Sequence, residues 1–373
     1  MDEDVDVRID ELLGNPVSLA DPGAVLGKID HPRCRWATVN RSLRDPDRRP
    51  PRIPDDQPIG DVFRRWMIYS RGEKHLELRR RFSGYFGPQQ AESFRTTVEE
   101  RVDATLEEAA PRGEMDLVTD LAHRITFPLI CDTMGVPDHD REELAHQTAA
   151  FEDAVPRQRD PEWAARGEAA AGRVMDVFES YFTARRAEPQ QDFLTDLVRS
   201  PLGDHEEWRD IAANCLFLLS NAFSNTPTLV AGTIGLLLDH PDALASLRRG
   251  EVTADQVAHE SARLLSPVTY TLSSDAEDEG WDTYYLAAAN RDPQEFPNPD
   301  LFDPTRSPNR HLTFFVGKHA CLGSSVATMI TGVATLRVTR RLSGLRRAGP
   351  PVWTSAIPLH RLGHLPVAWD RVT

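Results

Sequence analysis

Cys321 has the surroundings in this sequence that most favour chemistry. It ends the run His311-Leu-Thr-Phe-Phe-Val-Gly-Lys-His-Ala-Cys321, and a stretch with apolar residues at helical spacing follows. At a helix entrance, unpaired N–H groups and the helix dipole favour a thiolate over a thiol. Gly317 and Gly323 permit tight turns and the close approach of something flat and bulky. An isolated cysteine is most often a core residue, and the neighbours of Cys321 are what set it apart from that interpretation.

Two further pairs have spacings that place both side chains on one face of a helix. Glu260 and Arg263 are three residues apart, so a carboxylate and a guanidinium can pair bidentately. His75 and Arg79 are four apart, so their two donor groups would lie on one helix face. Each pair alone is common on protein surfaces, so the order of the motifs along the chain carries the argument.

Together these motifs resemble the cytochrome P450 family. The pattern G-x-H-x-C-x-G from Gly317 to Gly323 resembles its haem-thiolate loop, Glu260-Ser-Ala-Arg263 its E-x-x-R pair, and His75-Leu-Glu-Leu-Arg79 its H-x-x-x-R helix. Three shorter segments follow the family's order as well: Asp239-His-Pro-Asp242, residues 288–293 and residues 296–303. The resemblance implies a mainly α cytochrome P450 fold, an α-rich triangular prism with a long central helix.

The resemblance also implies a cofactor and its ligands. The cofactor would be haem b, iron protoporphyrin IX, with Cys321 as the axial iron ligand whose electron donation favours O–O cleavage. His75, Arg79 and His319 would hold the propionates. The full set of cofactor-binding residues that the resemblance implies is His75, Arg79, His319, Phe314, Gly317 and Gly323. Glu260, Arg263 and Arg306 would fix the loop that carries Cys321.

The middle of the long helix departs from the family. The family usually reads A-G-x-[D/E]-T-T there, and its acid and following threonine relay protons; this chain has Ser224 and Asn225 at those two positions. A carboxamide can orient water but does not titrate near neutral pH. A shift of one residue would instead put Asn225 at the acid position and Thr226 at the alcohol position, and both alignments stay open. The candidate catalytic residues are therefore Asn225, Ser224 and Thr226.

Two residues predict local distortions. Pro227 lies inside the long helix and lacks an N–H, so the carbonyl of Phe223 loses its usual partner and we expect a kink. Phe315 stands where the haem loop of the family generally has glycine. Because phenylalanine does not easily adopt positive φ, we expect a rearranged loop and weaker haem binding.

Two regions that would pair in a sheet are both short. Only Val268 to Leu286 remains where the family has two or three strands and an arginine that contacts a propionate, and no arginine lies between Arg263 and Arg291. The N-terminal region that would supply the partner strands is shortened too. Backbone groups in a sheet must be satisfied together. We expect one domain over residues 1–373, with reduced sheet and a more open substrate side.

Hydrophobic periodicity predicts the elements that position these motifs. Helical spacing runs through 94–110, 115–135, 141–155, 162–186 and 206–239. The last segment would be roughly 50 Å long and would form the central beam. The strand-like segments are Cys34 to Val39, Thr283 to Ala288 and the tail from Val352. The Pro/Arg/Asp-rich stretch from Asp45 to Pro58 predicts an exposed loop.

Composition narrows the class of protein. The chain has 373 residues, 40% of them hydrophobic, and a formal charge of −15. That charge disfavours nucleic acid and anionic membrane surfaces as partners. The acidic N-terminus shows no secretory signal and no apolar run reaches a membrane span, so we expect a cytoplasmic protein. The four cysteines form no C-x-x-C pair, which argues against a disulfide framework or a structural zinc site.

These observations favour a haem-thiolate oxidative enzyme, a monooxygenase or an atypical oxidative tailoring enzyme, for a small organic or specialised-metabolite substrate. Electrons would come from a ferredoxin-type partner or peroxide. A positive patch for an acidic donor would comprise Arg80, Arg81, Lys318, Arg337 and Arg340. The alternative is a non-oxidative relative, either an activating partner of another biosynthetic enzyme or a haem-dependent non-redox catalyst. By resemblance, residues 60–75 and 141–186 cover the pocket.

Overall fold

A computed structural model describes residues 21, 23, 27–50, 53, 56–57, 59–199, 205–274, 281–356 and 359–373. The helices are η1 (Pro32–Cys34), α3 (Trp36–Arg44), α4 (Gly60–Arg65), α5 (Gly72–Ser83), α6 (Pro88–Ser93), α7 (Arg95–Ala109), η2 (Leu117–Ala122), α8 (His123–Met134), η3 (Asp138–Asp140), α9 (Arg141–Ala154), η4 (Val155–Arg157), α10 (Pro161–Ala187), α11 (Phe193–Arg199), α12 (His205–Asp239), α13 (Pro241–Arg249), α14 (Ala254–Leu265), α15 (Leu286–Ala289), η5 (Gly317–His319) and α16 (Ser324–Arg341). The strands are β1 (Glu114–Asp116), β2 (Thr271–Ser274), β3 (Trp281–Tyr284), β4 (Leu342–Ser343), β5 (Arg346–Arg347), β6 (Val352–Ala356), β7 (Leu359–His364), β8 (Pro366–Ala368) and β9 (Arg371–Val372).

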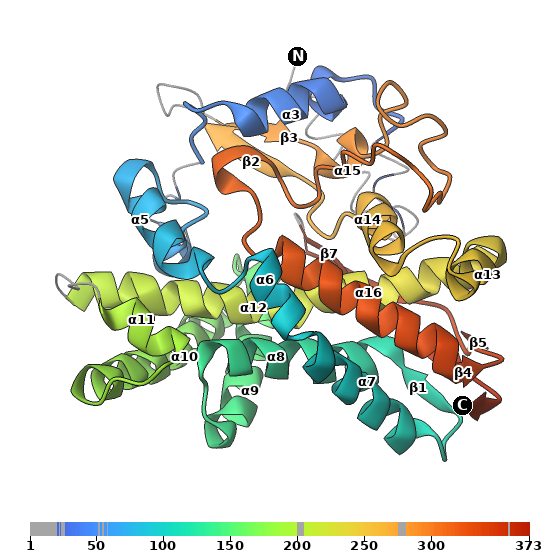
Figure 1. The fold of residues 1–373 in the computed structure, drawn as a ribbon. Coiled ribbons are helices and arrows are strands. Elements are labelled where there is room, and N and C mark those ends of the chain that lie inside the picture. Colours follow the sequence, from blue (N-terminus) through green and yellow to red (C-terminus); the bar gives the residue numbers. More distant parts are fainter. Residues whose placement is uncertain are drawn as a thin grey trace.

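Helix α12 is the central element, and it confirms the predicted long helix. Its 35 residues cross the middle of the molecule (Figure 1). The stretches 211–216 and 229–235 are buried on every side, which is the pattern of a helix inside a core. Pro241 suits the first turn of the next helix and separates α12 from α13. The middle turns of α12 can therefore line a site that lies between the two ends of the domain.

Two apolar cores lie along α12. The first packs α12 against α4, α5, α8, α9, α10 and α11, with Phe82, Phe151, Phe178, Phe182 and Phe193 among its fully buried side chains. The second joins α12 to α7, α8, α16 and the C-terminal strands through Val102, Leu106, Ile234, Ala334 and Val338. Each buried side chain of this size contributes about 1.5–3 kcal/mol. Burial on this scale fixes α12 relative to α16, whose first turn follows Cys321.

The strands form small antiparallel sheets, as the shortened sequence predicted. Strand β8 lies between β1 and β5, and the remaining pairs are β2 with β3, β4 with β9 and β6 with β7. Trp353 opposes Leu362 and Thr354 opposes Arg361 in the β6–β7 hairpin. This hairpin contacts α12 and brings the C-terminal part of the chain to the central helix. The residues between β2 and β3 lie outside the described part of the chain.

Two predicted strands were wrong in whole or in part. Residues 34–39 end η1 and begin α3 instead, because Pro32 starts a helical turn and Asp292 accepts a hydrogen bond from the Trp36 N–H (2.8 Å) at the start of α3. Residues 283–288 divide between β3 and α15. The predicted helix 115–135 starts with β1 and the π-helical η2, whose N-cap Asp116 accepts from two backbone N–H groups.

The stretch from Asp45 to Pro58 is not uniformly exposed. Among its described residues, Arg48 is 7% exposed and Ile53 is 8% exposed. A buried arginine in a loop requires partners, and Arg48 donates to the Leu272 carbonyl (2.8 Å) and to the Thr271 hydroxyl (3.0 Å) of β2. Abundant proline and charge predicted a loop correctly, but they did not predict which of its side chains would turn inward.

Candidate haem site

The loop before α16 presents Cys321. The Cys321 N–H donates to the Phe314 carbonyl (2.8 Å), and η5 gives the chain a tight turn in which Gly317 has a φ of 75°. A Cβ on Gly317 would lie 2.4 Å from the Leu43 carbonyl, so glycine is required there for space as well as for conformation. The sequence correctly indicated a tight loop at the entrance of a helix.

Phe315 keeps the left-handed conformation, with a φ of 57°. The expected rearrangement at this position is therefore wrong. Its cost of about 1–3 kcal/mol is the ordinary one for such a backbone. The ring packs against a small core that includes Leu43, Leu286 and Leu312, and this burial offsets the strain. The loop thus accommodates phenylalanine at a position where glycine would adopt the same backbone conformation with less strain.

The Cys321 side chain is exposed, although it lies between elements of the domain. The surrounding protein nevertheless restricts water and raises the pKa of the thiol, while the Gly323 and Ser324 N–H groups and Arg79 lower it. The helix entrance thus favours the thiolate, as expected, but desolvation is the larger contribution and the pKa of the thiol is raised. A metal ion would remove this proton, since thiols bind metals as thiolates.

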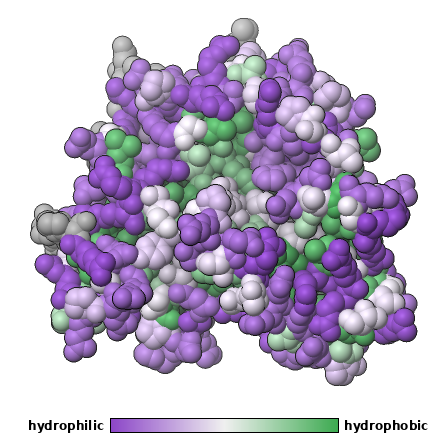
Figure 2. Space-filling model, viewed as in Figure 1, coloured by the Kyte–Doolittle hydropathy of each residue, from purple (hydrophilic) through white to green (hydrophobic). Residues whose placement is uncertain are grey.

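Side chains in the middle of α12 are more exposed to solvent than those in the stretches on either side of it. Residues 221–223, Asn225 and Thr226 are partly exposed, whereas residues 227–231 are buried. Phe314 of the Cys321 loop packs in one cluster with Leu229 and Leu265, so the loop faces this part of the helix. Figure 2 shows a hollow near the middle of this face, with hydrophobic residues at its bottom and hydrophilic ones around it. A flat apolar group fits between the loop and α12.

Cationic side chains gather at one edge of this site. The rings of His75 and His319 lie 4.2 Å apart between centroids, and Arg79 donates from Nη2 to the Ala320 carbonyl (2.7 Å). Burial, Arg79 and Lys318 lower the pKa of His75. Burial and the nearby cations lower the pKa of His319 to about 3. Mutual repulsion among these groups would be relieved by an anion, which is the requirement of two propionates.

Arg48 joins this cluster, and the sequence reasoning missed it. Its charge contributes to the lowered pKa of His319, so it lies near the same edge. Its buried Nε has no hydrogen-bond partner among the described residues. A buried donor without a partner costs about 1–3 kcal/mol, which a bound anion would recover. The signal available in the sequence was the missing arginine between residues 263 and 291, which required a substitute from elsewhere.

The three candidate catalytic residues differ in their contacts. Ser224 donates to the Ser220 carbonyl (2.9 Å) and is buried. Asn225 donates from Nδ2 to Asn221 Oδ1 (2.7 Å), and its Oδ1 has no partner among the described residues. Thr226 lies on the next position and is partly exposed. Of the three, Asn225 offers an acceptor to a water or a substrate in the opening.

Helix α12 continues through Pro227, and α8 supports the turn before it. The Thr126 hydroxyl donates to the Ala222 carbonyl (2.7 Å). His123 bonds the Phe223 carbonyl, the group that Pro227 deprives of its N–H, and its ring stacks on Phe223 with centroids 4.7 Å apart. This partner, which sequence reasoning missed, reduces the cost of the proline. The expected kink stays a prediction.

The Glu260–Arg263 pair is confirmed and fully buried. Arg263 donates to both oxygens of Glu260 at 2.9 and 2.8 Å, and both side chains are 0% exposed. The remaining donors of Arg263 reach three carbonyls, those of Asn290, Pro299 and Leu301. Glu260 also accepts from Arg306 (3.3 Å). The cluster ties α14 to the segment that leads into the Cys321 loop.

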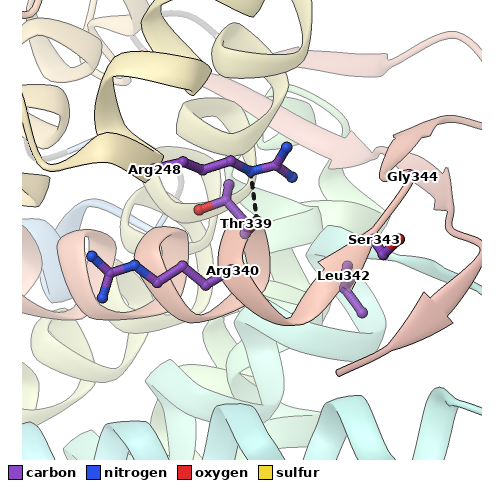
Figure 3. A pocket seen from close by; sticks show the side chains of 6 residues that line it. All are labelled: Arg248, Thr339, Arg340, Leu342, Ser343 and Gly344. Atoms are coloured by element: carbon purple, nitrogen blue, oxygen red, sulfur yellow. Dashed lines mark hydrogen bonds between the residues drawn. The ribbon is translucent and has the colours of Figure 1, made fainter.

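A separate surface hollow lies at the far end of α16 (Figure 3). It is open to solvent and is lined by Arg248, Thr339, Arg340, Leu342, Ser343 and Gly344. Arg248 donates to the Thr339 carbonyl (2.9 Å) there. Because α16 is roughly 25 Å long, this hollow is distant from Cys321 and plays no part in the site.

In this helical protein, the cysteine loop faces the central helix across an apolar hollow that has cations at one edge. This geometry suits a haem-thiolate site and defines the class of protein. The sequence pattern of the family described as Cytochrome P450 matches residues 283–344. A biotin biosynthesis cytochrome P450 of Bacillus subtilis (strain 168) is 31% identical, over 78% of this chain and 76% of that protein. The 6-deoxyerythronolide B hydroxylase of Saccharopolyspora erythraea is 30% identical, over 85% and 81%.

Solved structures agree with these sequences. P450BioI in complex with a hexadec-9Z-enoic acid ligated acyl carrier protein is 28% identical, with a TM-score of 0.83 over 90% of this chain and 91% of that one. The chain belongs to the cytochrome P450 family. It is a haem b protein and an oxidoreductase of the P450 type. In the described part of the chain, no helix combines the length and apolar character that a membrane crossing needs.

Proposed function

We propose that this protein is an oxidative tailoring enzyme, a monooxygenase of specialised metabolism that acts on a small organic substrate. The observation that carries the proposal is the exposed Cys321 thiol opposite the partly exposed middle of α12. Names of relatives support the substrate class, since they include a biotin biosynthesis cytochrome P450 and a 6-deoxyerythronolide B hydroxylase. When bound, haem ligated by a thiolate supplies oxygen activation.

In this proposal the proximal residues hold the cofactor. Cys321 ligates the iron through Sγ. His75, Arg79, His319 and Arg48 bind the propionates, and relief of their mutual repulsion adds to cofactor affinity. The remaining predicted cofactor residues form the walls and turns of the loop, and these are Phe314, Gly317 and Gly323.

Asn225 is the distal residue best placed to act on water. Its free Oδ1 accepts a hydrogen bond and so orients a water or a substrate hydroxyl, but the amide gives no proton near neutral pH. The proton must therefore come through water or from the substrate. Ser224 is committed to a backbone carbonyl, so it contributes to helix geometry and not to proton transfer in this proposal.

The electron donor is proposed to be a ferredoxin-type protein, with peroxide as the alternative oxidant. Arg80 and Arg340 are exposed and Lys318 is partly exposed, as an acidic partner requires. Arg81 and Arg337 already pair with Glu207 and Asp103, so they offer less positive charge than the sequence suggested. The patch that supports docking is smaller than expected.

The non-oxidative alternatives have less support. A protein that only activates another enzyme has no use for a thiol that opens on a hollow beside two arginines and two histidines that can donate to an anion. A haem-dependent non-redox catalyst would use the same proximal residues. It is distinguished by turnover without electrons or peroxide.

The test is an absorption spectrum of the purified, haem-loaded protein, reduced under carbon monoxide. Thiolate ligation by Cys321 shifts the band to the thiolate position. Cys321→Ser should abolish that band and leave the helical circular dichroism unchanged, while the matched variant Cys34→Ala should keep it. A thiolate band that persists in Cys321→Ser would contradict the proposed ligand. Substrate turnover with reduced ferredoxin, with peroxide and with neither then separates the oxidants.

A further inference from the structure

A buried ion pair joins three elements on the α12 side of the site. Glu152 of α9 pairs with Arg361 of β7, and the side chains are 6% and 14% exposed. The Ser220 hydroxyl of α12 donates to the other oxygen of Glu152. These residues are separated by more than 60 positions in the chain, and no motif of the sequence pointed to them. Burial raises the pKa of the Glu152 carboxyl, while Arg361 and Ser220 lower it.

The ion pair lies beside the open middle of α12. Ser220 precedes Asn221 by one residue and lies about 7.5 Å along the axis from Asn225. Strand β7 follows the same stretch, because the N–H of Leu362, next to Arg361, donates to the Thr228 hydroxyl (3.1 Å). The strand therefore passes along α12 from Ser220 to Thr228, with Asn225 between. Arg361 therefore lies beside the stretch of α12 that contains Asn225.

Arg361 of this ion pair has a hydrogen-bond donor that lacks a partner. The Ser220 hydroxyl donates to one oxygen of Glu152, and the other oxygen, Oε2, forms the ion pair with Arg361 without a hydrogen bond among the described residues. The buried Nε of Arg361 also has no hydrogen-bond partner among the described residues. A buried guanidinium N–H without an acceptor is costly, and the ion pair itself adds little net stability compared with apolar packing. Arg361 Nε–H is thus a donor that requires an acceptor.

An aromatic wall adjoins the pair on the same elements. Phe151 precedes Glu152 on α9, and Phe217 lies one turn before Ser220 on α12. The Trp66 ring contacts both, with centroids 4.7 Å from Phe217 and 6.0 Å from Phe151. Trp66 Nε1 is a second buried donor without a partner among the described residues. A flat apolar body fits this wall better than a strongly polar one.

We propose that Arg361, held by Glu152 and Ser220, is the specificity-determining anchor for a substrate that has an aromatic or flat apolar body and a terminal acceptor-oxygen group. The Arg361 Nε–H donates to a carboxylate or carbonyl oxygen of that group. The body lies along Phe217 and Trp66, and the end remote from the anchor faces Asn225 and the iron. This inference rests on the proposed function, because it orients a substrate for oxidation there.

The test measures binding of three probes that share one body: 4-phenylbutanoate, 4-phenylbutanamide and butylbenzene. Calorimetry with the haem-loaded protein gives the affinities without any need for turnover. The two oxygen-bearing probes should bind at least about tenfold more tightly than the hydrocarbon, which is what one hydrogen bond to a charged donor provides. The carboxylate and amide arms show whether the anchor selects an anion or a neutral carbonyl.

Substitutions of Arg361 test whether this residue causes the tighter binding of the oxygen-bearing probes. Arg361→Gln should remove it and bring the three affinities within about threefold of one another, since the donor strength and geometry of the guanidinium are lost. That variant leaves Glu152 buried without its cation, so the double variant Glu152→Gln/Arg361→Gln serves as the neutral replacement. Arg346→Gln is the matched control, because Arg346 is an exposed strand arginine paired with Asp370. It should keep the preference.

The outcomes separate the two proposals. If the wild-type protein binds all three probes equally or binds neither oxygen-bearing probe, the anchor is overturned. The same holds if the preference survives in both Gln variants, because the pair would then only fasten α9 to β7. In each case a thiolate band in the carbon monoxide spectrum, together with turnover that requires reduced ferredoxin or peroxide, shows that the proposed function stands. Loss of that band in the wild-type protein instead removes the function itself.

Discussion

The proximal and distal sides of the haem site are built in different ways. On the proximal side, both oxygens of Glu260 and the donors of Arg263 have partners, and both side chains are fully buried. On the distal side, Asn225 Oδ1 and Arg361 Nε lack partners among the described residues. A network in which every buried polar group has a hydrogen-bond partner fixes one geometry, whereas unpaired polar groups can bind a ligand. The Glu260–Arg263 network that supports the cysteine loop is thus fully paired, whereas unpaired polar atoms lie on the distal side and, at Arg48 Nε, on the cationic edge.

The largest effect is expected from breaking the proximal network. Glu260→Ala leaves the Arg263 guanidinium buried without its carboxylate, so the free energy of unfolding should fall by about 3–5 kcal/mol. Denaturant unfolding measures it. The matched control Glu92→Ala removes an exposed ion pair with Arg95 and should leave the free energy of unfolding nearly unchanged. Equal losses in the two variants would mean that the proximal side is no more tightly built than the surface.

The next effect concerns the cationic edge. Arg48→Gln removes one of the donors proposed for the propionates, and haem should dissociate about tenfold or more faster, because a charge-assisted hydrogen bond contributes about 1.5–3 kcal/mol. Haem transfer to an excess of apomyoglobin, followed by absorbance, gives the rate. The control is Arg44→Gln, since Arg44 is exposed and bonds Asn40. An unchanged rate in Arg48→Gln would confine Arg48 to its contacts with β2.

A smaller effect is expected on the distal side. Asn225→Ala removes the free acceptor, and turnover should slow by about tenfold, with a larger share of reducing equivalents lost to side products. Thr226→Val tests the shifted alignment in the same assay. If Thr226→Val slows turnover and Asn225→Ala does not, the hydroxyl is the functional group and the shifted alignment is correct.

A further effect, which is absent at neutral pH and grows as the pH falls, is a pH dependence at the border of the proximal side. Burial, His259 and Arg263 lower the pKa of His311 to about 3. Below about pH 6.5 the unfolded chain binds a proton that the folded chain does not, so stability falls as the pH falls toward 3, by up to about 1.4 kcal/mol per pH unit. His311→Asn should flatten the pH profile of thermal unfolding of the apoprotein between pH 6.5 and 4. The exposed His139→Asn should leave it unchanged; identical profiles for His311→Asn and wild type would refute the assignment.

The same comparison explains what the sequence could predict. The helices from residue 94 to 239 and the Glu260–Arg263 pair depend on spacings of three and four residues, so local patterns were sufficient. Residues 34–39 look like a strand locally, but Asp292, more than 250 positions away, caps them as a helix. Arg48, His123 and the Glu152–Arg361 pair also act through contacts distant in the chain. Such contacts have no local signature, and the distal side consists mostly of them.

The contact of Gly317 with the end of α3 has a consequence for how the protein folds. Gly317 fits against the Leu43 carbonyl, and Lys318 Nζ donates to the Pro46 carbonyl (2.7 Å) across 272 positions. Cys321 reaches its final place only after the widely separated segments around Leu43 and Gly317 have met. Contacts of such long range form slowly. The loop that presents Cys321 is therefore completed late in folding, after the local helices have formed.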